Sequence, residues 1–413
     1  MDSKLAIITS HPIQYQTPIF KELSRLGEIE FCVYFGSTHG ISPESEDIGF
    51  GRRFAWDLPL LEGYPHCFPN GDKFNHHSRK SWLLDIQDAG AIAAKDGITQ
   101  ILLMVSWSMI LFWRILGLSR RGNIPLIYRG ETVSAHWRQS TWWDRTQGLL
   151  KSRVKKAIYP LFLKKIDLFI TVGTLPERFL LEHGVNPSRF LRAPYCVDNE
   201  FFSQGVEQWK KSGELLSLRK ELDIPPEAKV ILYTGKFIPR KRPKDLIKAV
   251  KQLPKDLNAF LIMVGDGILM KEVQKEADGD NRIRLVGFQN QRDIVKYYAL
   301  SDIFVLPSDY ETWGLSVNEA MASSLPVVVS ERCTSAPDLV IAGKTGYTFP
   351  PGNVELLTDR LKSLLSDKDL RLEMSHNARD RIKQFSIERT ARTIIEASHK
   401  FNGLHTRQYN RME

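Results

Sequence analysis

Short apolar runs recur along the chain, and most are followed by a stretch in which apolar residues return every three or four positions. The runs predict buried strands, and the helical spacing predicts helices that cover a sheet. Strands are expected at residues 5–9, 30–35, 101–105, 125–128, 167–172, 229–234, 259–264, 282–286, 302–306, 326–330 and 346–349. Helices are expected at residues 17–26, 109–118, 176–183, 245–252, 268–277, 292–299, 315–323, 354–366, 368–385 and 387–401. This alternation is typical of α/β proteins with parallel, doubly wound sheets.

The 413 residues exceed what one hydrophobic core usually supports, so two domains are expected. A turn-rich segment, residues 193–202, separates two series of alternating strands and helices. The predicted boundaries are residues 1–195 for the first domain, 196–385 for the second and 386–413 for a terminal helical segment. The span 36–81 is rich in Gly, Pro, His and aromatic residues and predicts a long excursion from the first sheet.

The composition is that of an ordinary globular protein, with 42% hydrophobic and 25% charged residues. Its four cysteines are scattered and have no C-x-x-C spacing, which argues against a disulfide framework or a zinc site. They favour a reducing, cytoplasmic compartment. The first residues lead directly into a predicted strand and have no signal-peptide pattern. Residues 101–118 are apolar enough to be mistaken for a membrane span, but a strand, a polar loop and a helix describe them better.

The net charge of +9 is concentrated in one segment. Residues 145–165 carry seven Lys and Arg and no acid, apolar residues are interleaved, and Trp142 and Trp143 precede them. Residues 142–165 therefore predict contact with an anionic membrane surface. The alternative is a core helix whose outer face is basic. No nucleic-acid recognition module accompanies these charges, so nucleic-acid binding is not expected.

The most informative stretch runs from Ser308 to Ala320, between two predicted strands. A loop ending in Gly314 leads into a predicted helix, whose start should lie at the carboxyl edge of the sheet, where such folds bind ligands. The free backbone N–H groups of Gly314, Leu315 and Ser316 would form an anion site.

Two acids, Glu311 and Glu319, are eight positions apart across this loop. A carboxylate beside a bound phosphate would be repelled, so each acid is expected to bind hydroxyl groups instead. A pyrophosphate with a sugar at each end meets both demands. The alternatives are that Glu319, expected in the first helical turn, only complements the helix dipole and that Glu311 is a solvated loop charge.

A second polar loop, Gly235 to Pro243, follows the first strand of the second domain and holds four basic residues. Such a cluster at a strand's carboxyl end predicts an anion nearby, and the alternative is a solvated basic turn. Gly265 and Gly287 end the next two strands, and Phe288 follows the second of them. The loop at Gly265 lacks the third glycine of a dinucleotide fingerprint, so NAD binding is not favoured.

The E-x7-E spacing of Glu311 and Glu319 resembles the motif of retaining glycosyltransferases of family four, which have the GT-B fold. The segment 235–243 resembles that family's G-R-L-x-x-x-K-G element, with Lys236 in place of arginine and Lys241 at the lysine. The segment 195–202 resembles the family's interdomain linker. The resemblance implies two Rossmann-like domains with an interdomain cleft, and a terminal helix that crosses back to the first domain.

The resemblance also implies roles for these residues. Lys236 and Lys241 would bind the diphosphate, Glu311 the donor sugar and Glu319 the ribose hydroxyls. Gly235 and Gly265 would lie close to the nucleotide, and the base would be held near Gly287 and Phe288. The implied donor is a UDP or GDP sugar, with no tightly bound cofactor and no metal ion. The acid pair around Gly279, which mimics a D-x-D metal motif, is expected to be a polar turn.

The first domain supplies the predicted acceptor and donor-sugar side. His11 and Gln14 lie in the loop after the first strand, where H-P-I-Q-Y resembles one subset of the family, and His11 could instead only shape this loop. Relatives carry a histidine where this chain has Arg129 and Glu131, so either residue, or His136, is expected to replace it. The expected acceptor is a glycan or lipid-linked glycan. The protein itself is expected in the cytoplasm, with peripheral attachment to the inner face of the membrane.

Two other functions remain open from the sequence. A nucleotide-sugar epimerase on the same fold would turn over the donor without an acceptor. A non-catalytic glycan- or membrane-binding protein would bind the donor and form no product.

Overall fold

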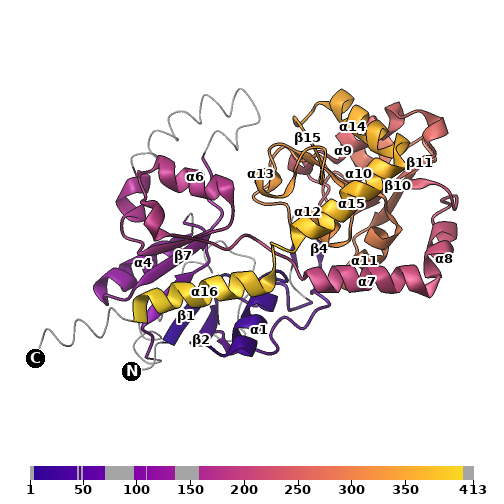
Figure 1. The fold of residues 1–413 in the computed structure, drawn as a ribbon. Coiled ribbons are helices and arrows are strands. Elements are labelled where there is room, and N and C mark those ends of the chain that lie inside the picture. The colour runs from indigo at the N-terminus through magenta and orange to yellow at the C-terminus, as the bar shows by residue number, and fades with distance from the viewer. Residues whose placement is uncertain are drawn as a thin grey trace, which may run out of the picture. The chain divides into compact units, whose positions relative to one another are not determined.

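The computed structural model describes residues 4–43, 46–47, 50–69, 97–107, 109–134 and 158–402 (Figure 1). The chain divides into two compact units. Unit 1 comprises Met1–Ser45, Phe54–Tyr195 and Ile387–Glu413, and unit 2 comprises Glu46–Arg53 and Cys196–Ser386. The short segment Glu46–Arg53 thus groups with unit 2, whereas the predicted boundary assigned it to the first domain.

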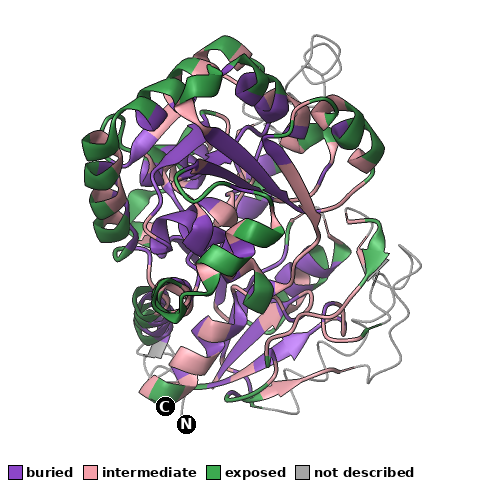
Figure 2. Cartoon of the chain, turned by 90° about the vertical axis from the view of Figure 1, so that its right-hand side faces the viewer, coloured by how far each residue is buried: buried purple, intermediate pink, exposed green. Residues whose placement is uncertain are grey.

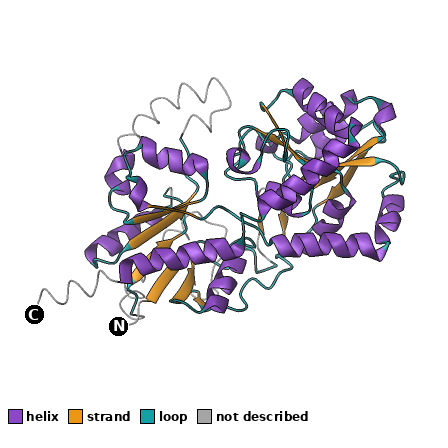
Figure 3. Ribbon diagram, in the orientation of Figure 1, coloured by secondary structure: helices purple, strands orange, loops and turns teal. Residues whose placement is uncertain are grey.

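Unit 1 is built on a seven-stranded sheet of order β5-β2-β1-β6-β7-β8-β9, in which every described pairing is parallel. Its strands are β1 (Lys4–Thr9), β2 (Glu30–Phe35), β5 (His66–Cys67), β6 (Gln100–Leu103), β7 (Leu126–Gly130), β8 (Leu168–Thr171) and β9 (Phe190–Arg192). The sheet is flanked by α1 (Thr17–Leu26), α4 (Ile110–Arg121), α6 (Thr174–Glu182) and α16 (Ile387–Asn402) (Figure 3). The terminal helix α16 packs on α1, so the end of the chain completes unit 1.

Unit 2 has a six-stranded parallel sheet of order β12-β11-β10-β13-β14-β15. Its strands are β10 (Lys229–Thr234), β11 (Ala259–Val264), β12 (Ile283–Gly287), β13 (Ile303–Leu306), β14 (Val327–Ser330) and β15 (Gly346–Phe349). Its helices are α7 (Asn199–Ser212), α8 (Glu214–Glu221), α9 (Pro243–Gln252), α10 (Met270–Ala277), α11 (Gln291–Leu300), α12 (Leu315–Ala322), α13 (Ala336–Leu339), α14 (Val354–Ser366) and α15 (Lys368–Ile382). The antiparallel pair β3 (Glu46–Asp47) and β4 (Arg52–Arg53) also belongs to this unit.

The strands are buried because helices cover the sheets, whereas the outer faces of those helices are exposed (Figure 2). In unit 2, Tyr233, Phe237 and Phe349 are at most 1% exposed and pack in one cluster with residues of α9 and α14. Continuous apolar strands of this kind are what a parallel sheet covered on both faces requires. The predicted α/β class with two doubly wound sheets is confirmed.

The segment 101–118 folds as predicted, with β6 followed by α4. Within the described ranges, no helix combines the length and the apolar character needed to cross a membrane. Of the basic segment 142–165, residues 142–157 lie outside the described residues, as does His136. Residues 158–163 are helical, and Leu161 is 67% exposed while Phe162 is buried.

Candidate functional site

Three loops at the carboxyl edge of the unit 2 sheet are hydrogen-bonded to one another. The N–H of Gly235 donates to the carbonyl of Val264 at 3.0 Å, and that of Gly265 donates to the carbonyl of Gly287 at 2.8 Å. A Cβ at Gly265 would overlap the carbonyl of Gly235, so this close approach requires glycine. The three glycines predicted to lie near the nucleotide therefore form one row across the ends of β10, β11 and β12.

Glu311 is held in a fully buried position at the end of β13. The residue is 4% exposed, and its carboxylate accepts from the Ser308 hydroxyl at 2.7 Å. The Lys241 ammonium lies 2.6 Å from the same carboxylate, and an Arg240 nitrogen lies 3.7 Å from it. The carboxylate is thus enclosed by a hydroxyl and two cations, which excludes the alternative that Glu311 is a solvated loop charge.

The ionisation of Glu311 is set by two opposing effects. Burial alone would raise the pKa of this carboxyl, but the positive charges of Lys241 and Arg240 and the hydrogen bonds outweigh it, so the pKa is lowered. Glu311 is therefore a carboxylate over the whole neutral pH range, and its charge is matched by Lys241.

The basic loop and the Glu311 loop are also joined through their backbones. The N–H of Asp309 donates to the Arg240 carbonyl at 2.7 Å, and the Arg240 side chain donates to the Tyr310 carbonyl at 3.2 Å. Because β10 and β13 are parallel neighbours, both loops leave the sheet at the same edge. The structure therefore brings Lys241 and Glu311 together, and Arg240 and Ser308 are partners that sequence reasoning missed.

Helix α12 begins directly after Gly314, which caps it with a φ of 92°. The preceding Trp313 is 2% exposed, and its indole N–H donates to the Asn318 side chain at 2.9 Å. This anchors the loop to the helix. The first-turn residues Leu315 and Ser316 are half-buried, and their backbone N–H groups have no partner within an α-helix. These N–H groups lie at the sheet edge that carries Lys241, and their binding of an anion stays a prediction.

Replacing Gly314 by Ala is expected to lower the free energy of unfolding by about 2–3 kcal/mol, because an L side chain is strained at this φ and its Cβ would lie 2.6 Å from the Cys333 sulfur. Urea unfolding measures the loss. Gly343→Ala is the matched control, since Gly343 has a φ of +75° but open space around its Cβ. Equal losses at both positions would show that packing around Gly314 contributes nothing.

Glu319 lies on the second turn of α12 rather than the first, because the helix begins at Leu315 and Glu319 is its fifth residue. Its role as a complement to the helix dipole is correspondingly weakened. Its carboxyl accepts from the Tyr298 hydroxyl at 2.7 Å, and that hydroxyl lies 2.9 Å from the Thr234 hydroxyl at the end of β10. Burial raises the pKa of Glu319, although the hydrogen bonds from Tyr298 and Gln291 and the charge of Lys241 oppose the rise.

Glu319→Ala is expected to weaken nucleotide binding by about 1–3 kcal/mol, the scale of hydrogen bonds to a charged group. Isothermal titration of the nucleoside diphosphate measures the change. Glu227→Ala is the matched control, because Glu227 is exposed and precedes β10 at the opposite edge of the sheet. Unchanged affinity in Glu319→Ala would contradict its assignment to the ribose hydroxyls.

Lys236 and Phe288 contact residues that were not predicted from the sequence. The Lys236 ammonium lies 2.8 Å from both carboxylate oxygens of Asp47 in β3. Phe288 makes an edge contact with Phe50, with ring centroids 4.9 Å apart, and Arg52 lies over its ring at 4.8 Å. No local pattern predicted these contacts, because Asp47 and Lys236 are 189 positions apart.

In unit 1, Arg129 ends up in an aromatic cluster at the end of β7. It is 2% exposed, and its guanidinium lies 4.8 Å from the ring centre of Tyr195, which makes an edge contact with Tyr15. Burial, and next to it the negative charge of Glu131, raise the pKa of Tyr15. The loop after β1 therefore meets Arg129 and Glu131 through Tyr15, a residue that the sequence analysis did not name.

The predicted residues His11 and Gln14 precede Tyr15 in this loop. The His11 ring accepts from or donates to the Ser10 hydroxyl at 2.9 Å and makes an edge contact with His39. Gln14 is half-buried. The structure thus groups Arg129 with Glu131, whereas His11 is fixed by Ser10 and His39.

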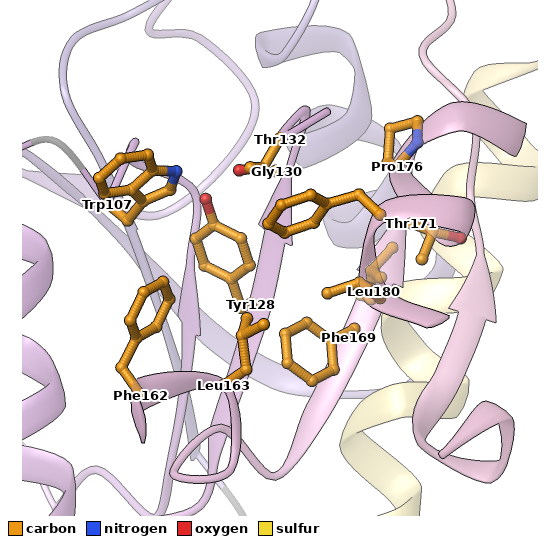
Figure 4. A pocket seen from close by; sticks show the side chains of 12 residues that line it. Trp107, Tyr128, Gly130, Thr132, Phe162, Leu163, Phe169, Thr171, Pro176 and Leu180 are labelled. Carbon is orange, nitrogen blue, oxygen red and sulfur yellow. The ribbon is translucent and has the colours of Figure 1, made fainter. Parts of the chain in front are cut away.

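A mostly apolar hollow opens beside the ends of β7 and β8 in unit 1 (Figure 4). The rings of Trp107, Tyr128, Phe162 and Phe169 line it, and Thr132 and Thr171 add hydroxyl groups.

The acids around Gly279 form a polar turn, as predicted. Asp280 pairs with Arg282 at 2.7 Å between α10 and β12, at the edge opposite the Lys241–Glu311 pair. Among the described residues, no three His, Cys, Asp or Glu side chains gather where they could hold a metal ion.

The sequence matches the family described as "Glycosyl transferases group 1" over residues 216–381, which lie within unit 2. It is 27% identical over 299 residues to a D-inositol 3-phosphate glycosyltransferase of Corynebacterium glutamicum, covering 70% of this chain and 67% of the relative. It is 33% identical over 163 residues to sulfoquinovosyl transferase SQD2 of Arabidopsis thaliana, covering 39% of this chain and 31% of that protein. The matches thus span about a third to two thirds of the lengths of these relatives.

The fold is similar to that of solved glycosyltransferases along nearly the whole chain. A glycosyltransferase from Rickettsia africae superposes with a TM-score of 0.71 at 16% identity, covering 97% of this chain and 99% of that one. Anabaena HepE, solved in complex with UDP-glucose, gives a TM-score of 0.69 at 16% identity and covers 96% and 99%. Residues 216–381 thus match the glycosyl transferases group 1 family, and the structural matches together with the two parallel sheets show that the chain has the GT-B fold.

Proposed function

We propose that the protein transfers a sugar from a nucleotide-diphosphate sugar to an acceptor hydroxyl, with retention of the anomeric configuration and without a metal ion. The observation that carries this proposal is the Lys241–Glu311 pair, 2.6 Å apart, at the sheet edge where α12 begins. A lysine, a buried carboxylate and free backbone N–H groups at one edge match the charges and hydroxyls of a sugar diphosphate.

In this proposal basic side chains and backbone N–H groups take the place that a metal ion fills in other enzymes with phosphate substrates. Lys241, Lys236 and the N–H groups of Gly314, Leu315 and Ser316 offset its negative charge. Lys241 is only 13% exposed, so its interaction with a phosphate oxygen is weakly screened by water. Charge builds on that oxygen as the sugar bond breaks, and a fixed ammonium stabilises it.

The transfer step uses the leaving group as the base. The acceptor oxygen forms a bond to the anomeric carbon on the face from which the diphosphate departs. The bond between that carbon and the phosphate oxygen breaks, its electron pair stays on the phosphate, and the acceptor proton moves to this oxygen. No separate protein base is needed, and Glu311 serves to hold the donor sugar and Lys241.

The donor and acceptor classes rest on similarity to known proteins. HepE, which shares the fold, binds UDP-glucose, which supports a UDP sugar, with a GDP sugar as the alternative. Similar proteins include a lipopolysaccharide core biosynthesis glycosyltransferase of Rhizobium meliloti, which supports a glycan or lipid-linked acceptor. The acceptor and donor-sugar side is proposed to include His11, Gln14, Arg129 and Glu131. The protein is proposed to act at the cytoplasmic face of the membrane.

A thermal-shift screen of UDP, GDP and ADP sugars tests the donor class, followed by NMR of the product formed with candidate acceptors in the presence of EDTA. The proposal predicts stabilisation by one nucleotide class and a product with the donor's anomeric configuration. Inversion, or loss of turnover in EDTA, would contradict the mechanism. Donor turnover without acceptor would instead indicate an epimerase.

A further inference from the structure

The segment containing β3 and β4 places a carboxylate on a residue of the proposed donor site. Both oxygens of Asp47 lie 2.8 Å from the Lys236 ammonium, and the two side chains are 21% and 31% exposed. Asp47 lies in the first half of the sequence, yet its segment, Glu46–Arg53, belongs to unit 2. Two oxygens facing one ammonium present the same chemistry as the oxygens of a phosphate.

The same segment reaches a second part of the proposed donor site. Phe50 touches Phe288 after β12, Arg52 lies over the Phe288 ring, and Lys236 lies 4.7 Å above the ring of Phe50. Strands β10 and β12 are separated by β11, so Lys236 and Phe288 follow strands whose ends are roughly 10 Å apart. The contacts therefore extend from the proposed diphosphate position to the proposed base position.

We propose that Asp47 competes with the donor diphosphate for Lys236, so that the nucleotide must displace this carboxylate in order to bind. This inference rests on the proposed function, in which Lys236 receives the diphosphate. A diphosphate beside Lys236 would be repelled by the negative charge of Asp47, since like charges this close disfavour each other. The Asp47–Lys236 pair is a self-blocking contact that lowers the affinity for the donor.

The test is isothermal titration of wild type and Asp47→Asn with UDP, GDP and ADP at low ionic strength. Asp47→Asn is expected to lower the Kd of the bound nucleotide by about three- to tenfold, because it removes a partly exposed ion pair and a repulsive charge. Asp47→Glu keeps the charge and should not bind more tightly than wild type. Asp256→Asn is the matched control, because Asp256 is exposed and precedes β11 at the opposite edge of the sheet.

The outcomes separate this inference from the function on which it rests. Equal or weaker binding in Asp47→Asn, with wild type binding normally, would overturn the competition and make Asp47 a supporting part of the donor site. An equal gain in Asp256→Asn would attribute the effect to net charge and also overturn it. If no nucleotide binds either protein and both unfold at normal temperatures, the proposed function itself fails.

Discussion

Replacing Lys241 by Ala is expected to lower kcat by about 10²–10³-fold, the scale of removing a group that stabilises developing charge. The donor Kd should change much less, because Lys236 and the start of α12 still bind the diphosphate in the ground state. Steady-state kinetics and isothermal titration measure the two quantities. Lys248→Ala is the control, since Lys248 is exposed on α9. Equal losses in kcat and donor affinity would mean that Lys241 only anchors the ground state.

The Lys241 variant also removes the main counter-charge of a buried carboxylate. Lys241 lowers the pKa of Glu311 more than Arg240 does, so its removal should let burial raise that pKa. Glu311 would then be destabilising as a carboxylate at neutral pH, and the variant should gain stability as the pH falls. The double variant Lys241→Ala, Glu311→Gln should recover stability but not turnover, which separates folding from catalysis.

Glu311→Gln is expected to lower kcat by about 10²-fold or more while nucleotide affinity stays close to wild type. Gln keeps the shape but cannot pair with Lys241 at 2.6 Å, so the ammonium loses the partner that fixes its position. The Ser308 hydroxyl would still find an oxygen acceptor, which should preserve the fold. Kinetics with saturating donor and acceptor, together with nucleoside diphosphate titration, measure this split.

Glu227→Gln, at the exposed acid before β10, is the control for Glu311→Gln. Turnover within a few-fold of wild type in Glu311→Gln would refute the role of Glu311 in holding Lys241 and the donor sugar. A large loss of nucleoside diphosphate affinity would instead place Glu311 against the nucleotide.

The sheet framework could be predicted because most strands of unit 2 are apolar runs, such as β11, β13 and β14. The observed strands Lys229–Thr234, Ala259–Val264 and Gly346–Phe349 coincide with the predicted ranges. In contrast, α7 and α8 were missed because part of their sequence was interpreted as a linker, and Gly205 and Gly213 interrupt the helical pattern. Strands β5 and β9 are too short for an alternating pattern to emerge.

The proximity of Glu311 to Lys241 followed from topology, because loops after neighbouring parallel strands share one edge of a sheet. No such rule predicts contacts between segments that are far apart in the sequence. The Asp47–Lys236 pair and the Arg129–Tyr195 contact depend on how loops fold back, and loop conformation has no period in the sequence. The roles assigned to these side chains remain predictions.

A nucleotide-diphosphate sugar is proposed to bind at the carboxyl edge of the unit 2 sheet. A crystal structure with the nucleoside diphosphate selected by the thermal-shift screen tests it most directly. The diphosphate is expected to contact Lys241 and the first N–H groups of α12, and the ribose hydroxyls are expected to bind Glu319. A diphosphate bound elsewhere, with Lys241 and Glu311 paired as before and untouched by the ligand, would contradict it.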